Sequence, residues 1–167
     1  MASMTVEFTD IESQNRPSFY ATPLAWATLA FTRVLVAEER DFTPHLTGLI
    51  VASDECSLGT IRELSRTAAQ GTISPLKFAG SSPSIVVGLP AMQLGIRGPT
   101  LCLTMRPDSA SDAILAMIDY WIRYNRIDAV IVIAHHNQGG RCHRFKGFVA
   151  RSADDASGRL VLQICKP

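Results

Sequence analysis

The hydrophobic and polar positions of the chain predict helices that alternate with short strands. Apolar runs that are typical of strands cover residues 46–52, 100–104 and 128–134; the first is short, apolar and followed by a polar loop, and it is expected to be buried. Apolar residues that recur every three or four positions, which are typical of helices, cover residues 22–39, 57–70, 82–94 and 109–126. This alternation predicts an α/β fold in which helices cover both faces of a sheet.

The two ends of the chain depart from this alternation. Residues 1–20 are mixed and polar and predict an N-terminal arm that contains one short strand, while residues 21–167 have the length of a single domain. Near the other end, residues 145–151 and 159–165 predict two strands joined by a turn at residues 154–158. We therefore expect a mixed sheet of about five strands that finishes in a C-terminal antiparallel hairpin.

Hydroxyl residues, glycine and proline mark the ends of the predicted helices. Thr22 is typical of a helix cap and Gly95 of a helix stop. Pro90 lies within one predicted helix, and it predicts a bend or a break there because proline lacks an N–H and clashes with the preceding turn. Ser109, or alternatively Asp108, is the predicted cap of the last of these helices.

The composition narrows the classes of partner. A formal net charge of +1 offers no field that would attract nucleic acid or an anionic membrane, and no apolar run approaches the roughly 20 residues of a membrane span. Four cysteines without a CxxC pair favour a reducing compartment, so we expect a cytoplasmic protein. The pair of glycines at residues 139–140 lacks the context of a phosphate loop and predicts a turn, and no cofactor is expected.

Residues 74–134 carry a more specific signal. The sequences SPLKF at residues 74–78 and SSPS at residues 81–84 precede a predicted helix, the turn LGIRGP at residues 94–99 and an apolar strand. This ordered series, followed by a long helix and DAVIV at residues 128–132, resembles the run that leads to the active cysteine of elongating β-ketoacyl synthases. The similarity covers about the first half of a family member. It implies half of a thiolase-like fold, with residues 21–167 as a ketosynthase N-terminal-like domain.

The family's nucleophile position is occupied by Pro107. In the family, the cysteine follows the proline of the turn, here Pro99, by eight residues and starts a helix whose N–H groups and dipole lower the thiol pKa. Proline has neither a nucleophile nor an N–H, and no cysteine lies within two residues of this position. The family's assisting histidines belong to its second half, which has no counterpart in these residues. The resemblance therefore implies a non-catalytic subunit in polyketide or fatty-acid-type biosynthesis, similar to the chain length factors that pair with active ketosynthases.

The helix predicted at residues 109–126 indicates where a partner would bind. Its charged residues fall within an arc of roughly 60°, and apolar residues spread over most of the rest, which suggests burial on two sides. Without a partner, Met117 and Trp121 would be exposed at a loss of about 2 kcal/mol each. We therefore expect a homodimer or a heterodimer with a full-length ketosynthase, with a monomer as the alternative. In the family the strand before the nucleophile also pairs across the dimer, and this implies four further interface residues: Leu101, Cys102, Leu103 and Thr104.

Two groups of polar residues are candidates for chemistry. His135 and His136 follow an apolar strand, with Cys142 and His143 beyond a turn, but neighbouring histidines point to opposite sides of an extended chain and no carboxylate lies among them, so no metal is expected. The alternative function is a small acyl-thioester hydrolase or dehydratase that uses His135, His136 or Cys142.

The other group is basic. Arg106 is a candidate for contact with the phosphopantetheine phosphate of an acyl carrier protein. Arg141, Arg144 and Lys146 form a small cluster that either meets an acidic carrier protein or is a solvated face.

Overall fold

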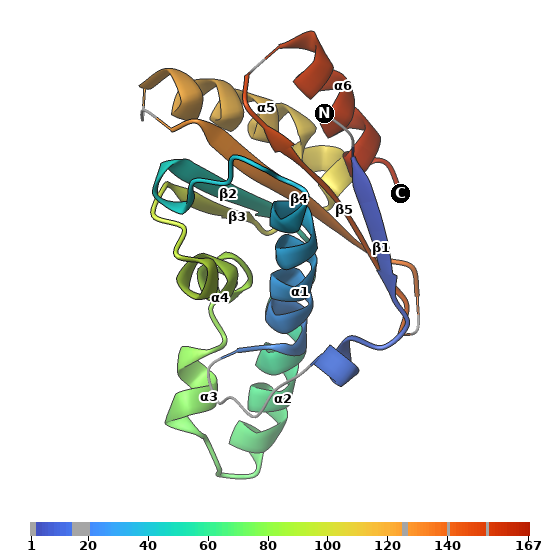
Figure 1. The fold of residues 1–167 in the computed structure, drawn as a ribbon. Coiled ribbons are helices and arrows are strands. Elements are labelled where there is room, and N and C mark those ends of the chain that lie inside the picture. Colours follow the sequence, from blue (N-terminus) through green and yellow to red (C-terminus); the bar gives the residue numbers. More distant parts are fainter. Residues whose placement is uncertain (1–2, 15–20, 125–126, 140, 153) are drawn as a thin grey trace.

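The centre of the molecule is a five-stranded mixed sheet (Figure 1). The computed structural model describes residues 3–14, 21–124, 127–139, 141–152 and 154–167. Its strands are β1 (Met4–Phe8), β2 (Thr47–Ala52), β3 (Thr100–Leu103), β4 (Ala129–Asn137) and β5 (His143–Ala150), in the order β1-β5-β4-β2-β3. β2 is parallel to β3 and β4, whereas β5 is antiparallel to β4 and β1. The α/β class and the mixed sheet of five strands are confirmed.

Helices cover both faces of the sheet, as the alternation predicts. α1 (Pro23–Ala37) and α4 (Ile85–Leu94) lie on one face, and α5 (Pro107–Tyr124) and α6 (Asp155–Cys165) lie on the other (Figure 1). Side chains alternate along β4, so that Ile131 and Ile133 join the core under α1 and α4 while Val130 and Val132 join the core under α5 and α6. Within the described residues, no helix combines the length and apolarity needed to cross a membrane.

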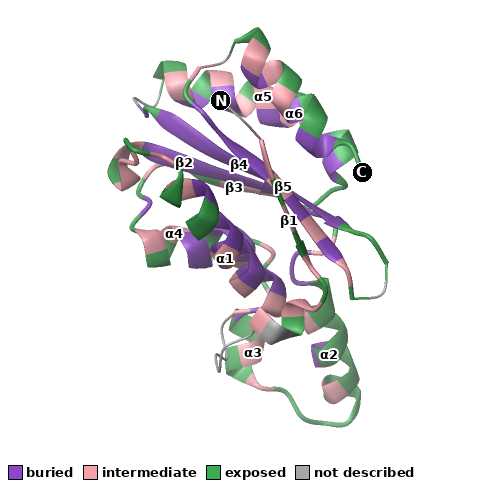
Figure 2. Cartoon of the chain, turned by 45° about the vertical axis from the view of Figure 1, so that its right-hand side comes forward, coloured by how far each residue is buried: buried purple, intermediate pink, exposed green. Residues whose placement is uncertain are grey.

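The remaining helices lie away from the sheet. α2 (Leu58–Ala69) and α3 (Pro75–Ala79) form a largely exposed extension, in which Leu64 is the buried residue of α2 (Figure 2). Short 3-10 turns occur at η1 (Ile11–Gln14) and η2 (Pro44–Leu46). The predicted helix at residues 57–70 is confirmed by α2, whereas α3 is an element that the sequence pattern did not predict.

The C-terminal segment differs from its prediction. Residues 159–165 belong to α6 and are not a strand, so the antiparallel hairpin is formed by β4 and β5 instead. The Asp154 carboxylate caps α6 by accepting the Ser157 N–H at 2.9 Å. Ser157, Val161 and Ile164 recur at helical spacing and are buried on one side, which is the pattern of a helix that packs on a sheet.

The alternative of a break at Pro90 and the predicted caps of α5 were also wrong. α4 runs unbroken through Pro90, which is buried within a helix that packs along α1, so the loss of one backbone hydrogen bond does not break it. α5 begins at Pro107, so Ser109 and Asp108 lie in its first turn and are not caps. Proline suits the first position of a helix because no partner exists there for an N–H.

Some predicted elements reach residues that the structure does not describe. β1 is the short strand expected in the N-terminal arm, and it pairs with β5 at one edge of the sheet. Residues 15–20 of that arm and residues 125–126 at the end of the helix predicted at 109–126 lie outside the described residues.

The turn at residues 95–99 places β3 beside β2. Gly95 ends α4 with a φ of 67°, a conformation that favours glycine. The Gly98 N–H donates to the Thr47 carbonyl at 3.1 Å, and the Leu49 N–H donates to the Pro99 carbonyl at 3.0 Å. These bonds hold the start of β3 against the start of β2.

Candidate functional site

Three parallel strands end at one edge of the sheet and bring residues distant in sequence together. The register pairs Ala52 of β2 with Leu103 of β3 on one side and with Ala134 of β4 on the other. From that level the chain leaves β2 and β3 for the loops before α2 and α5, while β4 continues to Asn137. Ligands of parallel sheets bind at this carboxyl edge.

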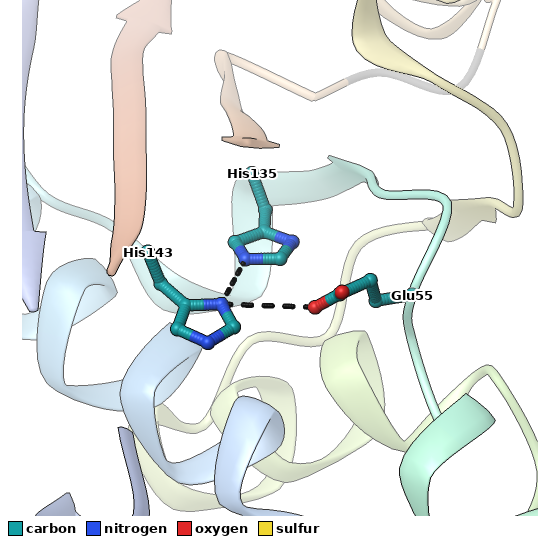
Figure 3. Close-up of side chains that lie close together, drawn as sticks. All are labelled: Glu55, His135 and His143. Atoms are coloured by element: carbon teal, nitrogen blue, oxygen red, sulfur yellow. Dashed lines mark hydrogen bonds and ion pairs between the residues drawn. The ribbon is translucent and has the colours of Figure 1, made fainter. Parts of the chain in front are cut away.

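A cluster of two histidines and one carboxylate lies at this edge (Figure 3). Nε2 of His135 is 2.9 Å from Nδ1 of His143, and the same Nδ1 is 3.7 Å from Oε2 of Glu55. The three residues come from β4, β5 and the loop after β2, and their ligand atoms all lie within 4.8 Å of one another. His135 is fully buried, the His143 side chain is 8% exposed, and that of Glu55 is 32% exposed. The Asn137 amide donates a hydrogen bond to the other oxygen of Glu55.

Ser53 determines the tautomer of His135. The Ser53 hydroxyl oxygen accepts the N–H groups of Glu55 at 3.1 Å and Cys56 at 3.3 Å, which occupies both of its lone pairs. Its own proton therefore points to Nδ1 of His135, 2.8 Å away. Neutral His135 then carries its proton on Nε2 and donates it to Nδ1 of His143.

Burial keeps His135 uncharged. Desolvation, followed by the neighbouring His143 and His136, lowers the pKa of His135 to about 3. The imidazole is thus neutral near pH 7 and can act as a ligand, a hydrogen-bond donor or an acceptor.

His136 belongs to the opposite face of the sheet. Its Nε2 lies 2.8 Å from the carbonyl of Ile164 in α6, and burial lowers its pKa although that hydrogen bond raises it. The expectation that the two neighbouring histidines point to opposite sides is therefore confirmed. The expectation that no carboxylate lies among the histidines is wrong, because Glu55 reaches His143 from the loop after β2.

Cys142, the third residue named for the hydrolase alternative, lies apart from the two histidines in hydrogen bonding. It is half-buried in the turn between β4 and β5, where its backbone bonds to Gly139 and Gln138. Within the part of the chain that the structure describes, no hydrogen bond joins the Cys142 thiol to His135 or His136.

The sequence did not predict that two thiols, those of Cys56 and Cys102, lie together. The sulfur atoms of Cys56 and Cys102 lie 3.5 Å apart, and both cysteines are free. The hydrogen bond between them lowers the pKa of Cys56 and raises that of Cys102. The sequence held no signal for this pair, because it depends on the placement of β3 beside β2.

Pro107 lies in a hollow on the α5 side of the edge. This hollow of about 200 Å³ is lined by Arg106, Pro107 and Asp108 on one side and by residues 135–138 of β4 and its turn on another. Pro107 itself is buried and starts α5 directly after β3. The position singled out in the sequence therefore faces a small open space at the carboxyl edge.

The predicted interface residues lie in two environments. Leu101 and Leu103 are half-buried against the core under α5, Cys102 is half-buried on the other face, and Thr104 is exposed. Among the described residues, β3 pairs with β2 alone and forms an edge of the sheet.

Trp121 is buried within its own chain, contrary to the expectation that it would be exposed without a partner. Its side chain is packed so closely over β2 that a Cβ at Gly48 would come within 3.0 Å of the Trp121 ring. Met117 is half-buried. The helix α6, which was predicted as a strand, lies beside α5 and covers part of the apolar surface that was assigned to a partner.

The four basic residues all have partners. Arg106 pairs with Asp108 at 2.6 Å, Arg144 pairs with Glu7 at 2.8 Å, and Arg141 lies 3.9 Å from Asp10. The Lys146 ammonium donates to the carbonyl of Lys166 at 2.6 Å. Exposed pairs of this kind are worth about 0–1 kcal/mol, so each remains available to a stronger anionic partner.

Comparison with known proteins rests on the fold. No family model matches the sequence, and no curated protein matches it. Among solved structures, the chain is similar to the ishigamide ketosynthase/chain length factor, with a TM-score of 0.65 and 15% identity over 83% of this chain and 47% of that one. It is also similar to the structure of the ketosynthase ApeO in complex with its chain length factor ApeC from Xenorhabdus doucetiae, with a TM-score of 0.58 and 11% identity over 93% of this chain and 73% of that one.

The match to the first of these structures covers only part of that chain. The chain spans about half the length of the ishigamide protein chain. At this level of identity the likeness concerns the backbone, and it agrees with the five-stranded sheet and the helices on both of its faces. The chain therefore has the ketosynthase-like fold that ketosynthases and chain length factors adopt.

Proposed function

We propose that this chain is a non-catalytic ketosynthase-like subunit of polyketide or fatty-acid-type biosynthesis, located in the cytoplasm. It acts by associating with a full-length ketosynthase, with a second copy of itself or with an acyl carrier protein. The similar solved structures are described as a ketosynthase/chain length factor and as a ketosynthase in complex with its chain length factor, which supports such a partnership.

The observation that carries this proposal is Pro107 at the start of α5. The residue follows the strand β3 and faces the hollow at the carboxyl edge, where the sequence resemblance places the nucleophile of a condensing enzyme. A proline ring offers no thiol, and the missing N–H removes one oxyanion donor. An acyl group delivered to this hollow would find no attacking atom at that position.

The proposed interface combines an edge strand with one side of α5. β3 has one unpaired edge among the described residues, and an edge strand pairs readily with a strand of another chain. Leu101, Leu103 and Met117 are all half-buried against the core under α5, and the proposal assigns their exposed parts to one contact region. Cys102 in β3 and Thr104, which directly follows β3, complete the proposed interface, whereas Trp121 contributes from within the fold and not by direct contact.

Contact with a carrier protein is assigned to Arg106 first. Its side chain is 66% exposed and lines the Pro107 hollow, so its guanidinium can exchange Asp108 for a phosphate at the mouth of the hollow. Arg141, Arg144 and Lys146 would support the same partner from β5 and the turn before it.

A condensation assay tests the catalytic part of this proposal. The purified chain is incubated with an acyl thioester and a malonyl thioester, and decarboxylation and carbon–carbon bond formation are followed beside an active ketosynthase. We expect neither product from this chain. Turnover by the chain alone would contradict the proposal.

A further inference from the structure

In the cluster of His135, His143 and Glu55, lone pairs of two neighbouring ligand atoms face each other with no proton between them. In the neutral state, Nδ1 of His143 uses its lone pair to accept the proton of His135. The Glu55 carboxylate, 3.7 Å from the same Nδ1, therefore faces a nitrogen that has no proton to donate. A cation that accepts an electron pair from each of the three atoms would remove this conflict.

From this geometry we infer that His135, His143 and Glu55 bind a divalent metal ion of the zinc type. A cation in the plane of the three atoms and equally far from each, with separations of 2.9 Å, 3.7 Å and at most 4.8 Å between them, would lie roughly 1.9–2.4 Å from each atom. This range includes the zinc–nitrogen and zinc–oxygen distances of about 2.0–2.2 Å. Two imidazoles and one carboxylate suit zinc, whereas magnesium and calcium prefer sites made of oxygen atoms.

The surroundings of the three residues match those of a metal site. A metal bound to Nε2 of His135 requires the ring proton on Nδ1, where the Ser53 hydroxyl lies 2.8 Å away. In the metal-bound form the Ser53 oxygen would accept this ring proton in place of one of the two backbone N–H groups that it accepts in the metal-free form. The Asn137 amide holds the second oxygen of Glu55 and directs the first one toward the histidines.

The partial exposure of Glu55 leaves the site open on one side. Glu55 lines a surface hollow of about 320 Å³, and His143 lines a separate hollow beside Glu12 and Arg141. A metal held by three protein ligands therefore has room for water or another ligand in the fourth position, as in open zinc sites. This inference is independent of the proposed partnership, because it concerns residues that are not assigned to the interface.

Isothermal titration with zinc chloride on the full chain, stripped beforehand with a chelator, tests the inference. We expect about one zinc ion per chain, together with a higher melting temperature on zinc addition. Magnesium chloride is expected to produce neither effect. Glu55→Gln and His143→Asn should each lower zinc affinity by more than the roughly 10–100-fold that is typical of losing a supporting hydrogen bond.

Two controls keep the outcome decisive. His45→Asn alters an exposed histidine in η2 and should leave zinc affinity unchanged. If His143→Asn does not fold, the zinc affinity of Glu55→Gln tests the inference. This variant should fold because glutamine has the same shape as glutamate and the position is partly exposed. Equal zinc binding by the wild type and Glu55→Gln would overturn the inference, as would binding that persists in both variants and disappears in Cys56→Ser, because that would place zinc on the thiols. Failure of the wild type to bind zinc would also overturn it.

Discussion

The hydroxyl of Ser53 lies 2.8 Å from Nδ1 of His135, and both residues are fully buried. The same oxygen accepts the N–H groups of Glu55 and Cys56, so one side chain connects the end of β2, the loop that follows it and the histidine of β4. Buried polar groups that lose their partners keep the full cost of their desolvation.

Ser53→Ala should therefore destabilise the fold. It leaves Nδ1 of His135 and two backbone N–H groups without their hydrogen-bond partner, and we expect a loss of about 1–3 kcal/mol in the free energy of unfolding. Urea denaturation at neutral pH in the presence of a chelator measures it. Ser109→Ala, which removes an exposed hydroxyl bonded to Asp108, should change the free energy by less than about 0.5 kcal/mol. Equal effects of the two substitutions would contradict the role of Ser53.

The contact between Gly98 and Thr47 leads to a second prediction. A Cβ at Gly98 would lie 2.3 Å from the Thr47 carbonyl oxygen, so Gly98→Ala must push β3 away from β2. We expect a loss of about 1–3 kcal/mol in the free energy of unfolding. The matched control is Gly88→Ala within α4, where a Cβ meets nothing within 4 Å; it should stabilise the protein by about 0.5–1 kcal/mol. Thermal unfolding of both variants checks the opposite signs.

The Asp154 cap of α6 should make the stability of the protein depend on pH in the acidic range. Backbone hydrogen bonding by Ser157, with support from Ser152, lowers the pKa of Asp154 below its ordinary value of 3.8. The folded state thus binds this proton less readily than the unfolded state does, so the stabilisation is present above that ordinary value and is lost as the pH falls through the lower pKa of the folded state. Asp154→Asn keeps a capping acceptor and should show a weaker loss of stability in acid than the wild type. Identical pH profiles from urea denaturation would contradict this.

A substitution at Met117 tests whether the proposed interface lies on α5. It is half-buried on α5, and Met117→Lys would place a charge in the region shared with Leu101 and Leu103. We expect this variant to remain folded and to lose association in sedimentation velocity. Leu162→Lys is the control, since it introduces the same charge at an exposed apolar position on α6. If both variants associate as the wild type does, the interface lies elsewhere.

The sequence predicted those features that depend on local pattern. The apolar runs of β2, β3 and β4 and the periodicity of α1, α2 and α5 were recognised because each is decided within a few residues. In α6, the short apolar stretch within residues 159–165 suggested a strand, while the helical spacing of Ser157, Val161 and Ile164 is decisive only when the sheet above it is known.

The candidate site was predicted only in part. His135, His136 and His143 stood out because they gather near the end of one strand, but Glu55 lies 80 residues earlier than His135 in the sequence. Its approach depends on the parallel pairing of β2 with β4, which no local pattern shows. The burial of Trp121 was missed for a similar reason, because it depends on the close packing of α5 over Gly48.

The central claim is that this ketosynthase-like chain acts by pairing and not by catalysis. Sedimentation velocity of the chain mixed with a full-length ketosynthase from the same organism tests it most directly. The account predicts a stable complex at micromolar concentration that Met117→Lys weakens. A chain that sediments as a monomer, both alone and in the mixture, would contradict it.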